Sequence, residues 1–296
     1  MSAIDLSLLP SPQVVEPLNY ETIRAEMIAE LVAIDPDFAE LIESDPAIKI
    51  LEVVAYRELM LRQRVNDAAK GVMLAEARGS DLDQIGANFN IARLVITPGD
   101  SSAIPPVAEV RESDKDFRAR IQLALEGITT AGSKGSYVFH GLGADPDVRD
   151  LQAVTPEPGS VSVYVLSRTA DGSASTDLVN AVAAALNAEN VRPLTDNVTV
   201  QSAVIVEYSV QAELTMFAGP DPEVVRQSAE DSLTAYVESI RKIGYDVTIS
   251  GLYSALHQPG VQSVTLISPG ATVVIDDGEA AYCTAITVTA TESTDV

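Results

Sequence analysis

Several residue types are scarce in this chain of 296 residues, which has one cysteine (Cys283), two histidines and no tryptophan. A single thiol can form neither an internal disulfide nor a cysteine-based zinc site. Basic residues are also few, because 19 Lys and Arg stand against 43 Asp and Glu, for a formal net charge of -24. So little positive charge argues against nucleic acid and anionic membrane surfaces as partners.

Long apolar runs are missing as well. No stretch approaches the roughly 18 residues that a membrane-spanning helix needs. The first residues, MSAIDLSLLPSPQVVEP, lack the basic segment and long apolar core of a secretory signal. We therefore expect no membrane insertion, in a chain whose 46% hydrophobic content is ordinary for a folded globular protein.

The usual motifs of catalysis are absent too. Neither a phosphate-binding glycine loop nor a G-x-S-x-G sequence occurs. His140 and His257 occupy equivalent places in two similar segments and could meet at a metal, but a repeated structural role explains them more simply. Cys283 lies in an alternating strand pattern, where a buried structural thiol is more usual than a nucleophile. The prediction is a protein that is not an enzyme, with no catalytic residue, metal site or cofactor.

The pattern along the chain predicts an α+β protein. A helical N-terminal third, able to form a bundle, is followed by mixed α/β sandwich-like lobes. An αββ outline recurs in residues 137–163 and 253–275, each read as helix, strand, Pro-Gly turn and strand. The predicted divisions are an extended arm (1–20), a helical bundle domain (21–96), a polar connector with a helix (97–130) and an α+β body (131–296).

The longest predicted helix covers residues 47–78, is ended by Gly79 and is followed by a helix with Ser80 as its N-cap. Apolar residues recur in it at alternating steps of three and four, the heptad spacing of bundles and coiled coils. The same helix holds six Lys and Arg against four acids, although the chain as a whole is strongly acidic. Helix packing is therefore its expected role, and charge is expected to select the partner.

The arginines of this helix differ in their local partners. Glu58 and Arg62 have the i,i+4 spacing of an ion pair, and Arg64 can reach Asp67 at i,i+3. Arg57 has no acid three or four residues before or after it, and it lies seven residues before Arg64, on the same side of the helix. Its side chain could be solvated, pair with the acid-rich residues 1–46, or meet another subunit. The predicted partner interface consists of Leu51, Val54, Arg57, Leu61, Arg64, Val65, Ala68 and Val72.

Three stretches carry a resemblance to a known family. They are DPAIKILEVVAYRELMLRQRVNDAAKGVMLAEARGSDLDQIGANFNIAR at 45–93, DKDFRARIQLALEGITTAGSKGSYVFHGLGADPDVRDLQAVTPEPGSVSVYVLS at 114–167 and AYCTAITVT at 281–289. With the matching order of the segments between them, they resemble the baseplate J family of contractile-tailed phages. The resemblance implies a structural wedge protein in the tail baseplate of a virion or of a phage-derived particle such as an R-type pyocin, assembled in the bacterial cytoplasm.

The resemblance also implies partners. Family members join their N-terminal helices in a core bundle, two copies with one copy of a second wedge protein. Their C-terminal lobes contact other copies in a ring around the hub and spike, and a sheath-initiator-type baseplate protein is a further partner. Rearrangement of the wedge is then coupled to sheath contraction, with residues 97–112 as the expected pivot.

Two other functions remain open from the residues themselves. The Thr- and Val-rich lobes would suit an adhesin that binds host surfaces, and Cys283 would be the nucleophile of a hydrolase. The long helical N-terminal third suits assembly better than either.

Overall fold

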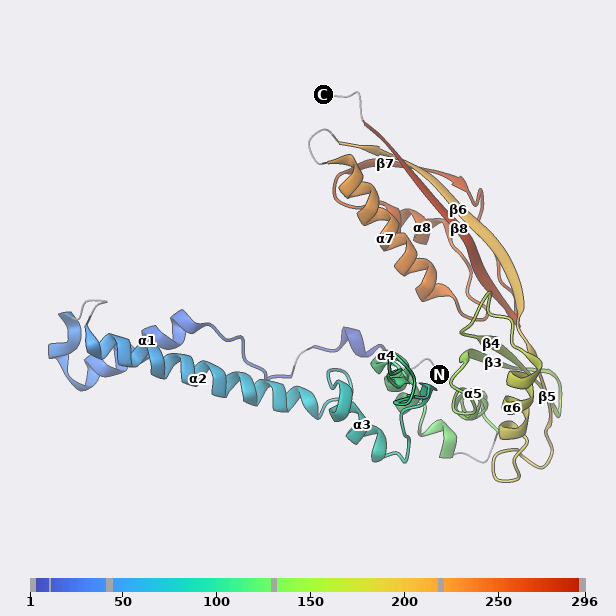
Figure 1. Cartoon of the computed structure of the whole chain (residues 1–296), viewed down its shortest axis with the longest axis horizontal. Coiled ribbons are helices and arrows are strands. Elements are labelled where there is room, and N and C mark those ends of the chain that lie inside the picture. Colours follow the sequence, from blue (N-terminus) through green and yellow to red (C-terminus); the bar gives the residue numbers. More distant parts are fainter. Residues whose placement is uncertain (1–3, 11, 41–44, 129–131, 218–220, 293–296) are drawn as a thin grey trace. The chain divides into compact units, whose positions relative to one another are not determined.

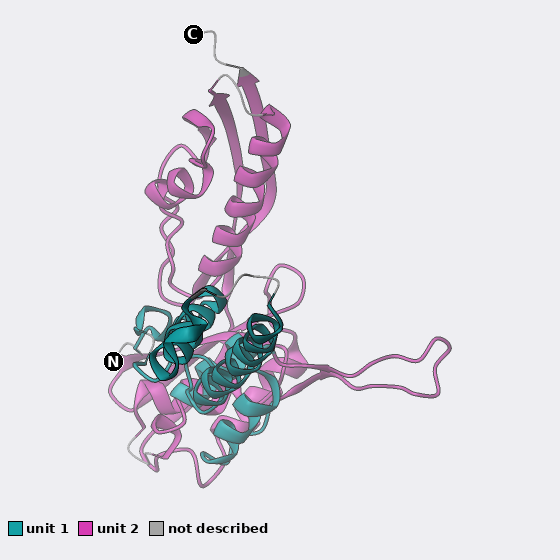
Figure 2. Ribbon diagram, turned by 90° about the vertical axis from the view of Figure 1, so that its left-hand side faces the viewer, with its two compact units in different colours: residues 1–93, 113–122 teal, residues 94–112, 123–296 magenta. Residues whose placement is uncertain are grey.

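A computed structural model describes residues 4–10, 12–40, 45–128, 132–217 and 221–292. The chain forms two compact units (Figure 2). Unit 1 consists of residues 1–93 and 113–122, and unit 2 of residues 94–112 and 123–296. None of the described helices is long and apolar enough to cross a membrane.

Unit 1 is helical, and its first two long helices lie side by side as a hairpin (Figure 1). These helices are α1 (Tyr20–Ile34) and α2 (Pro46–Gly71), with short 3-10 helices at Leu6–Leu8 and Pro36–Glu40. Asn19 caps α1 by accepting from two backbone N–H groups of its first turn, and Asp45 caps α2 by accepting from the Ala47 N–H. The start of each helix is therefore set by residues next to it in the sequence.

The end of α2 corrects the sequence analysis, which extended this helix to residue 78. The helix ends at Gly71, and the next one, α3 (Gly79–Ala87), begins at the residue predicted to separate them. Arg118 explains the break, because its guanidinium donates to the carbonyl oxygens of Leu74 and Ala77, each at 2.6 Å. Ser80 is not the N-cap; the cap position is occupied by Arg78, without a side-chain cap bond. Gly79 has a φ of 50°, which glycine adopts readily.

Arg118 belongs to α4 (Asp114–Gln122), which completes unit 1. Phe117 of this helix is fully buried, and the ring lies so close to Gly86 of α3 that a Cβ there would come within 2.5 Å of it. The guanidinium of Arg93 lies 4.7 Å from the centre of the same ring. Arg93 also pairs with Asp83 and Asp114, each at 2.8 Å. These contacts hold α4 against α3, although 26 residues separate them in the sequence.

In unit 2, residues 94–112 form a β-hairpin where the sequence indicated a polar connector. Strand β1 (Val95–Thr97) pairs antiparallel with β2 (Val110–Arg111), and a further bridge joins Asp100 to Val107. The Leu94 N–H also donates to the Glu112 carboxylate. Figure 2 shows this segment as a narrow, extended hairpin.

The first lobe of unit 2 contains the three-stranded sheet β3-β4-β5 and two helices. The central strand β4 is antiparallel to β3 and parallel to β5. Its core joins side chains of the sheet to Leu178, Val182 and Leu186 of α6. The elements are α5 (Lys134–Leu142), β3 (Val148–Glu157), β4 (Ser160–Ser167), α6 (Thr176–Leu186) and β5 (Asn197–Ser202).

The second lobe repeats this plan in the sheet β7-β6-β8, whose central strand β6 is antiparallel to β7 and parallel to β8. Every second residue of β6 from Tyr208 to Met216 is buried, in a core shared with α7 and α8. The elements are β6 (Val204–Met216), α7 (Pro222–Ile240), α8 (Ile249–Leu256), β7 (Val261–Ser268) and β8 (Glu279–Glu292).

The two lobes bear out part of the internal similarity seen in the sequence. In each, a short helix leads into the antiparallel edge strand, α5 into β3 and α8 into β7. The predicted second strand at 271–275 is wrong, because these residues form only an isolated bridge between Val273 and Val247. The parallel strand of the second lobe comes later, as β8. The α+β class, with helices first, is as predicted.

Three polar residues of β3, Arg149, Asp150 and Gln152, bind the second lobe. Arg149 donates to the carbonyl oxygens of Glu238 and Arg241 at the end of α7, at 2.8 and 2.9 Å. Asp150 accepts from the Ile243 N–H at 2.9 Å, and Gln152 accepts from the Gly278 N–H at 2.7 Å. An apolar cluster of Leu166, Ala203, Ile243 and Ala280 lies beside them. The junction of the two lobes therefore consists largely of hydrogen bonds between side chains of β3 and main-chain groups of the second lobe.

Candidate assembly interface

Helix α2 has two faces with apolar residues, and one of them is covered within unit 1. Ile48 and Ala55 are buried on this inner face, and Ile23 is buried on α1. Arg24 of α1 reaches Glu52 of α2 at 3.4 Å. The inner face is therefore the contact of the helical hairpin.

Asn66 extends the inner face and fixes the N-terminal arm. Its side-chain oxygen accepts from the Glu16 N–H at 3.0 Å, and its amide donates to the Glu16 carbonyl at 2.9 Å. Glu16 also pairs with Arg62. This contact was not predicted from the sequence. The available signal was the position of Asn66, eleven residues or about three helical turns after Ala55 and therefore on the same face of the helix.

The opposite face of α2 is exposed in the described part of unit 1. Nine residues, or two and a half turns, separate Ile48 from Arg57 and Ala55 from Arg64, so the two arginines point away from the hairpin contact. Apolar side chains flank them, with exposed fractions of 45% for Val54, 65% for Leu61 and 57% for Val65. The sequence analysis missed further exposed apolar residues of this outer face, which are Ile50, Val53 and Met60.

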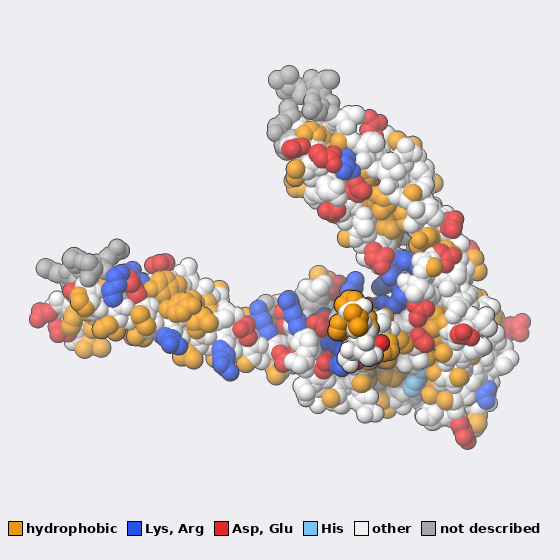
Figure 3. Space-filling model, in the orientation of Figure 1, with side chains coloured by type: hydrophobic (Ala, Val, Ile, Leu, Met, Phe, Trp, Pro, Cys, Tyr) orange, Lys and Arg blue, Asp and Glu red, His pale blue; other side chains and the backbone are white. Residues whose placement is uncertain are grey.

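Most of the predicted interface residues lie on this outer face. Val54, Arg57, Leu61, Arg64, Val65 and Ala68 are exposed along it, and Val72 is exposed at the C-cap of α2. Leu51 differs, because it follows the buried Ile48 by one turn and is itself partly buried. Figure 3 shows hydrophobic and basic side chains interspersed along the helical hairpin.

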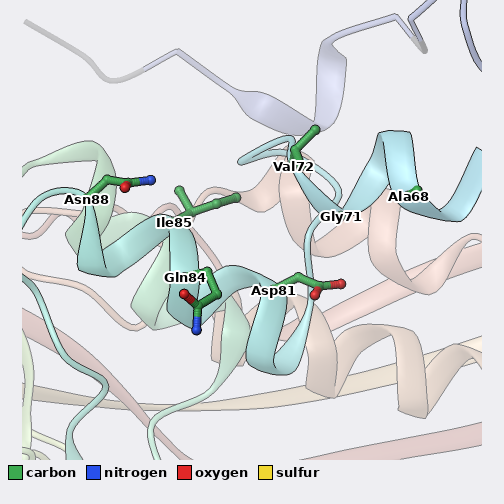
Figure 4. A pocket seen from close by; sticks show the side chains of 7 residues that line it. All are labelled: Ala68, Gly71, Val72, Asp81, Gln84, Ile85 and Asn88. Carbon is green, nitrogen blue, oxygen red and sulfur yellow. The ribbon is translucent and has the colours of Figure 1, made fainter.

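Two hollows lie along α2. One, of about 340 Å³, is lined by Arg57, Met60, Leu61, Gln63, Arg64 and Asp67. The other, of about 420 Å³, lies where α2 ends and α3 begins, and Figure 4 shows its seven lining side chains. Ala68 and Val72 of the predicted interface line it, together with Asp81, Gln84 and Ile85 of α3. The outer face thus continues from α2 onto α3.

The charges of the outer face are only partly satisfied within the chain. The predicted pair of Glu58 and Arg62 forms. The predicted pair of Arg64 and Asp67 does not, because Asp67 accepts from the amide of Gln63 at 2.7 Å. In the part of the chain that the structure describes, neither Arg57 nor Arg64 has an ion-pair partner. Two guanidinium groups thus lie among apolar side chains without a carboxylate.

Burial shifts the pKa of two of the residues considered for chemistry. Burial raises the pKa of the Cys283 thiol, whereas a nucleophilic cysteine needs a lowered pKa. Burial lowers the pKa of His140, whose ring packs edge-on against Phe139. Within the described residues, no group of three or more His, Cys, Asp or Glu side chains could hold a metal ion.

An exposed apolar helix face indicates a site for another protein. Such a face is typical of structural proteins that act by assembling with others. The chain belongs to the baseplate J family. The model of the baseplate J-like N-terminal domain matches residues 43–100, that of the central domain 129–202, and that of the C-terminal domain 208–289. The chain is therefore a structural protein of a phage-type tail baseplate, in a family that is not known for enzymes.

A relative that is similar over almost the whole chain supports this assignment. The chain is 49% identical over 291 residues to "Baseplate protein J" of Escherichia phage P2, covering 96% of each chain. It is also similar to a chain in the cryo-EM structure of the anti-feeding prophage baseplate, with 16% identity and a TM-score of 0.42. That similarity covers 67% of this chain and 50% of the other.

Proposed function

We propose that the chain is a wedge component of a contractile-tail baseplate, and that the outer face of α2 binds a second wedge protein. The bare outer face carries this proposal. Burying one of its large apolar side chains against a partner would contribute about 1.5–3 kcal/mol. Several such side chains in one row give the hydrophobic centre that a stable interface needs.

The remaining parts of the proposal follow from the division of the chain. The two lobes of unit 2 would contact other copies of the chain in a ring around the hub and spike, and a sheath-initiator-type protein would join them. Residues 97–112 would act as the pivot, since they belong to unit 2 but lie in sequence between the two segments of unit 1. Rearrangement about this pivot would be coupled to sheath contraction, which requires interfaces with two discrete packings.

Replacing Leu61 and Val65 together by Asp tests the α2 interface. Both side chains are more than half exposed, so the free chain should lose at most about 0.5 kcal/mol of stability. Two carboxylates inside an apolar contact would be buried without partners, so binding to the second wedge protein should be lost. The measurement is co-purification after joint expression, with circular dichroism of the free variant as the test of folding.

The matched control is the double variant Leu194→Asp/Val274→Asp, which makes the same chemical change at two exposed side chains outside unit 1 and outside the proposed pivot. It should co-purify like the unaltered chain. If the Leu61→Asp/Val65→Asp variant co-purifies equally well, the outer face of α2 is not the interface.

A further inference from the structure

The two arginines on the outer face of α2 indicate what kind of surface this face binds. Arg57 and Arg64 lie one heptad apart, with Leu61 between them, and both line the same hollow. The acid in that hollow, Asp67, already accepts from Gln63. The hollow therefore carries a net positive charge, in a chain whose total charge is -24.

If an apolar surface without hydrogen-bond acceptors covered a guanidinium, the group would lose its hydration and gain no hydrogen bond in exchange. The penalty for a buried, unpaired ion is several kcal/mol, more than one additional apolar contact contributes. The surface that covers Arg57 and Arg64 must therefore bring acceptors with it. Carboxylates suit guanidinium groups best, because they can accept two parallel hydrogen bonds.

The same face of a second copy meets this requirement poorly, because the acid that lines the hollow, Asp67, already accepts from Gln63 of its own helix. If two α2 helices pack antiparallel about Leu61, Arg57 of each lies opposite Arg64 of the other. If they pack parallel and in register, each arginine lies opposite its own counterpart. A shift of half a heptad separates the charges but buries each guanidinium against Leu61. All three arrangements are unfavourable, by like-charge repulsion or by desolvation.

We propose that the partner of this face is a helix of another protein that carries two carboxylates about two turns apart within an apolar stripe. This inference rests on the proposed role of α2 as an interface and adds the chemistry of its partner. The arginines then have two effects: they attract the acidic helix and prevent two copies from joining through their outer faces. Such repulsion against the wrong partner is a common source of specificity in helix pairing.

A charge-swapped copy of the chain provides a defined probe of this selectivity. In the variant Arg57→Glu/Arg64→Glu the outer face becomes the acidic, apolar surface that we propose for the partner. In an antiparallel pair with the unaltered chain, each arginine lies opposite a glutamate. We expect the mixed pair to associate at least about tenfold more tightly than either chain with itself, and less so at high salt.

Sedimentation velocity on the two purified chains, separately and mixed, measures these affinities. A third variant, Arg57→Leu/Arg64→Leu, removes both charges and should associate with itself more tightly than the unaltered chain does. Lys115→Glu/Lys134→Glu changes the net charge equally at two exposed lysines outside the face and should leave every affinity unchanged. If the mixed pair is no tighter than the self pairs at low salt, the inference is wrong.

Assembly with the second wedge protein distinguishes this inference from the proposed function. Arg57→Glu/Arg64→Glu should lose co-purification, whereas Arg57→Lys/Arg64→Lys should retain it. If the glutamate variant still co-purifies while Leu61→Asp/Val65→Asp does not, α2 is the interface but its partner is not acidic. If neither variant loses co-purification, the proposed function of α2 fails as well.

Discussion

The helical hairpin of α1 and α2 and the lobe around β6 differ in where their apolar side chains lie. Along β6, every second residue from Tyr208 to Met216 enters a core that α7 and α8 close from one side. Along the 26 residues of α2, the buried residues are Ile48, Ala55 and Asn66. The lobe is completed by its own chain, whereas the hairpin keeps an apolar face that none of the described residues covers. The apolar side chains of the lobe are therefore buried in its own core, whereas many of those on α2 are exposed.

The largest effect should come from the core of the second lobe. Leu233 of α7 is fully buried, so Leu233→Ala should lower the free energy of unfolding by about 2–5 kcal/mol through lost contacts and a cavity. Chemical denaturation followed by circular dichroism measures the loss. Val224→Ala, at an exposed position of the same helix, is the control and should stay within about 0.5 kcal/mol. Equal effects at both positions would contradict a self-contained lobe.

The next effect should be at Asn66, the polar residue of the inner face. Asn66→Ala leaves the N–H and carbonyl groups of Glu16 without these partners, at a cost of about 1–3 kcal/mol. Because this contact holds only the arm, hydrogen exchange should rise in residues 12–19 and stay unchanged in α7. Gln63→Ala, at an exposed position one turn earlier, should leave exchange in the arm as it is. Unchanged protection of the arm in Asn66→Ala would show that other contacts hold it.

A smaller effect should appear in the pH dependence of the lobe junction. Burial raises the pKa of Asp150 above its usual 3.8, although the N–H groups of Ile243 and Leu151 partly oppose the rise. A raised folded-state pKa stabilises the fold below about pH 4, and this contribution is lost as the pH rises through the folded-state pKa. Asp150→Asn keeps an acceptor for Ile243 and removes the titration, so the free energy of unfolding should fall less steeply above pH 4. Identical pH profiles for the two chains would contradict this.

The smallest effect on the free chain should be that of Leu61→Ala. Its side chain is 65% exposed, so the free energy of unfolding should change by less than about 0.5 kcal/mol. Binding to the second wedge protein should weaken nonetheless, because the same side chain would be buried there. Titration of the purified proteins against each other measures the loss. A change in folding stability as large as that of Leu233→Ala would mean that Leu61 already packs within its own chain.

Features of the fold that depend on neighbouring residues could be predicted from the sequence. Asp221, next to Pro222 in the sequence, caps α7, and β3 and β4 form the predicted hairpin around the Pro-Gly turn. The end of α2 could not be predicted, because it depends on Arg118, more than 40 residues away. Neighbouring residues also do not show that β5 and β6, which follow each other directly in the sequence, belong to different sheets.

The candidate interface, too, could be predicted only where it depends on the regular repeat of its own helix. Heptad spacing identified most of the outer face, since a helix repeats regularly whether or not its partner is present. It could not reveal which apolar positions α1 covers, so Leu51 was included and Ile50, Val53 and Met60 were missed. The sequence also could not show that Gln63, rather than Arg64, would bind Asp67, because both spacings are allowed on a helix.

The junction between the two lobes has a consequence for how this protein can diverge. Arg149, Asp150 and Gln152 bind the main-chain groups of Glu238, Arg241, Ile243 and Gly278, which every residue except proline provides in full. Substitutions at the second lobe's side of the junction can therefore accumulate while the bonds persist. The side chains that must be kept for these hydrogen bonds are those of three nearby residues on one strand, β3. A relative could change much of the facing surface and still keep its two lobes joined.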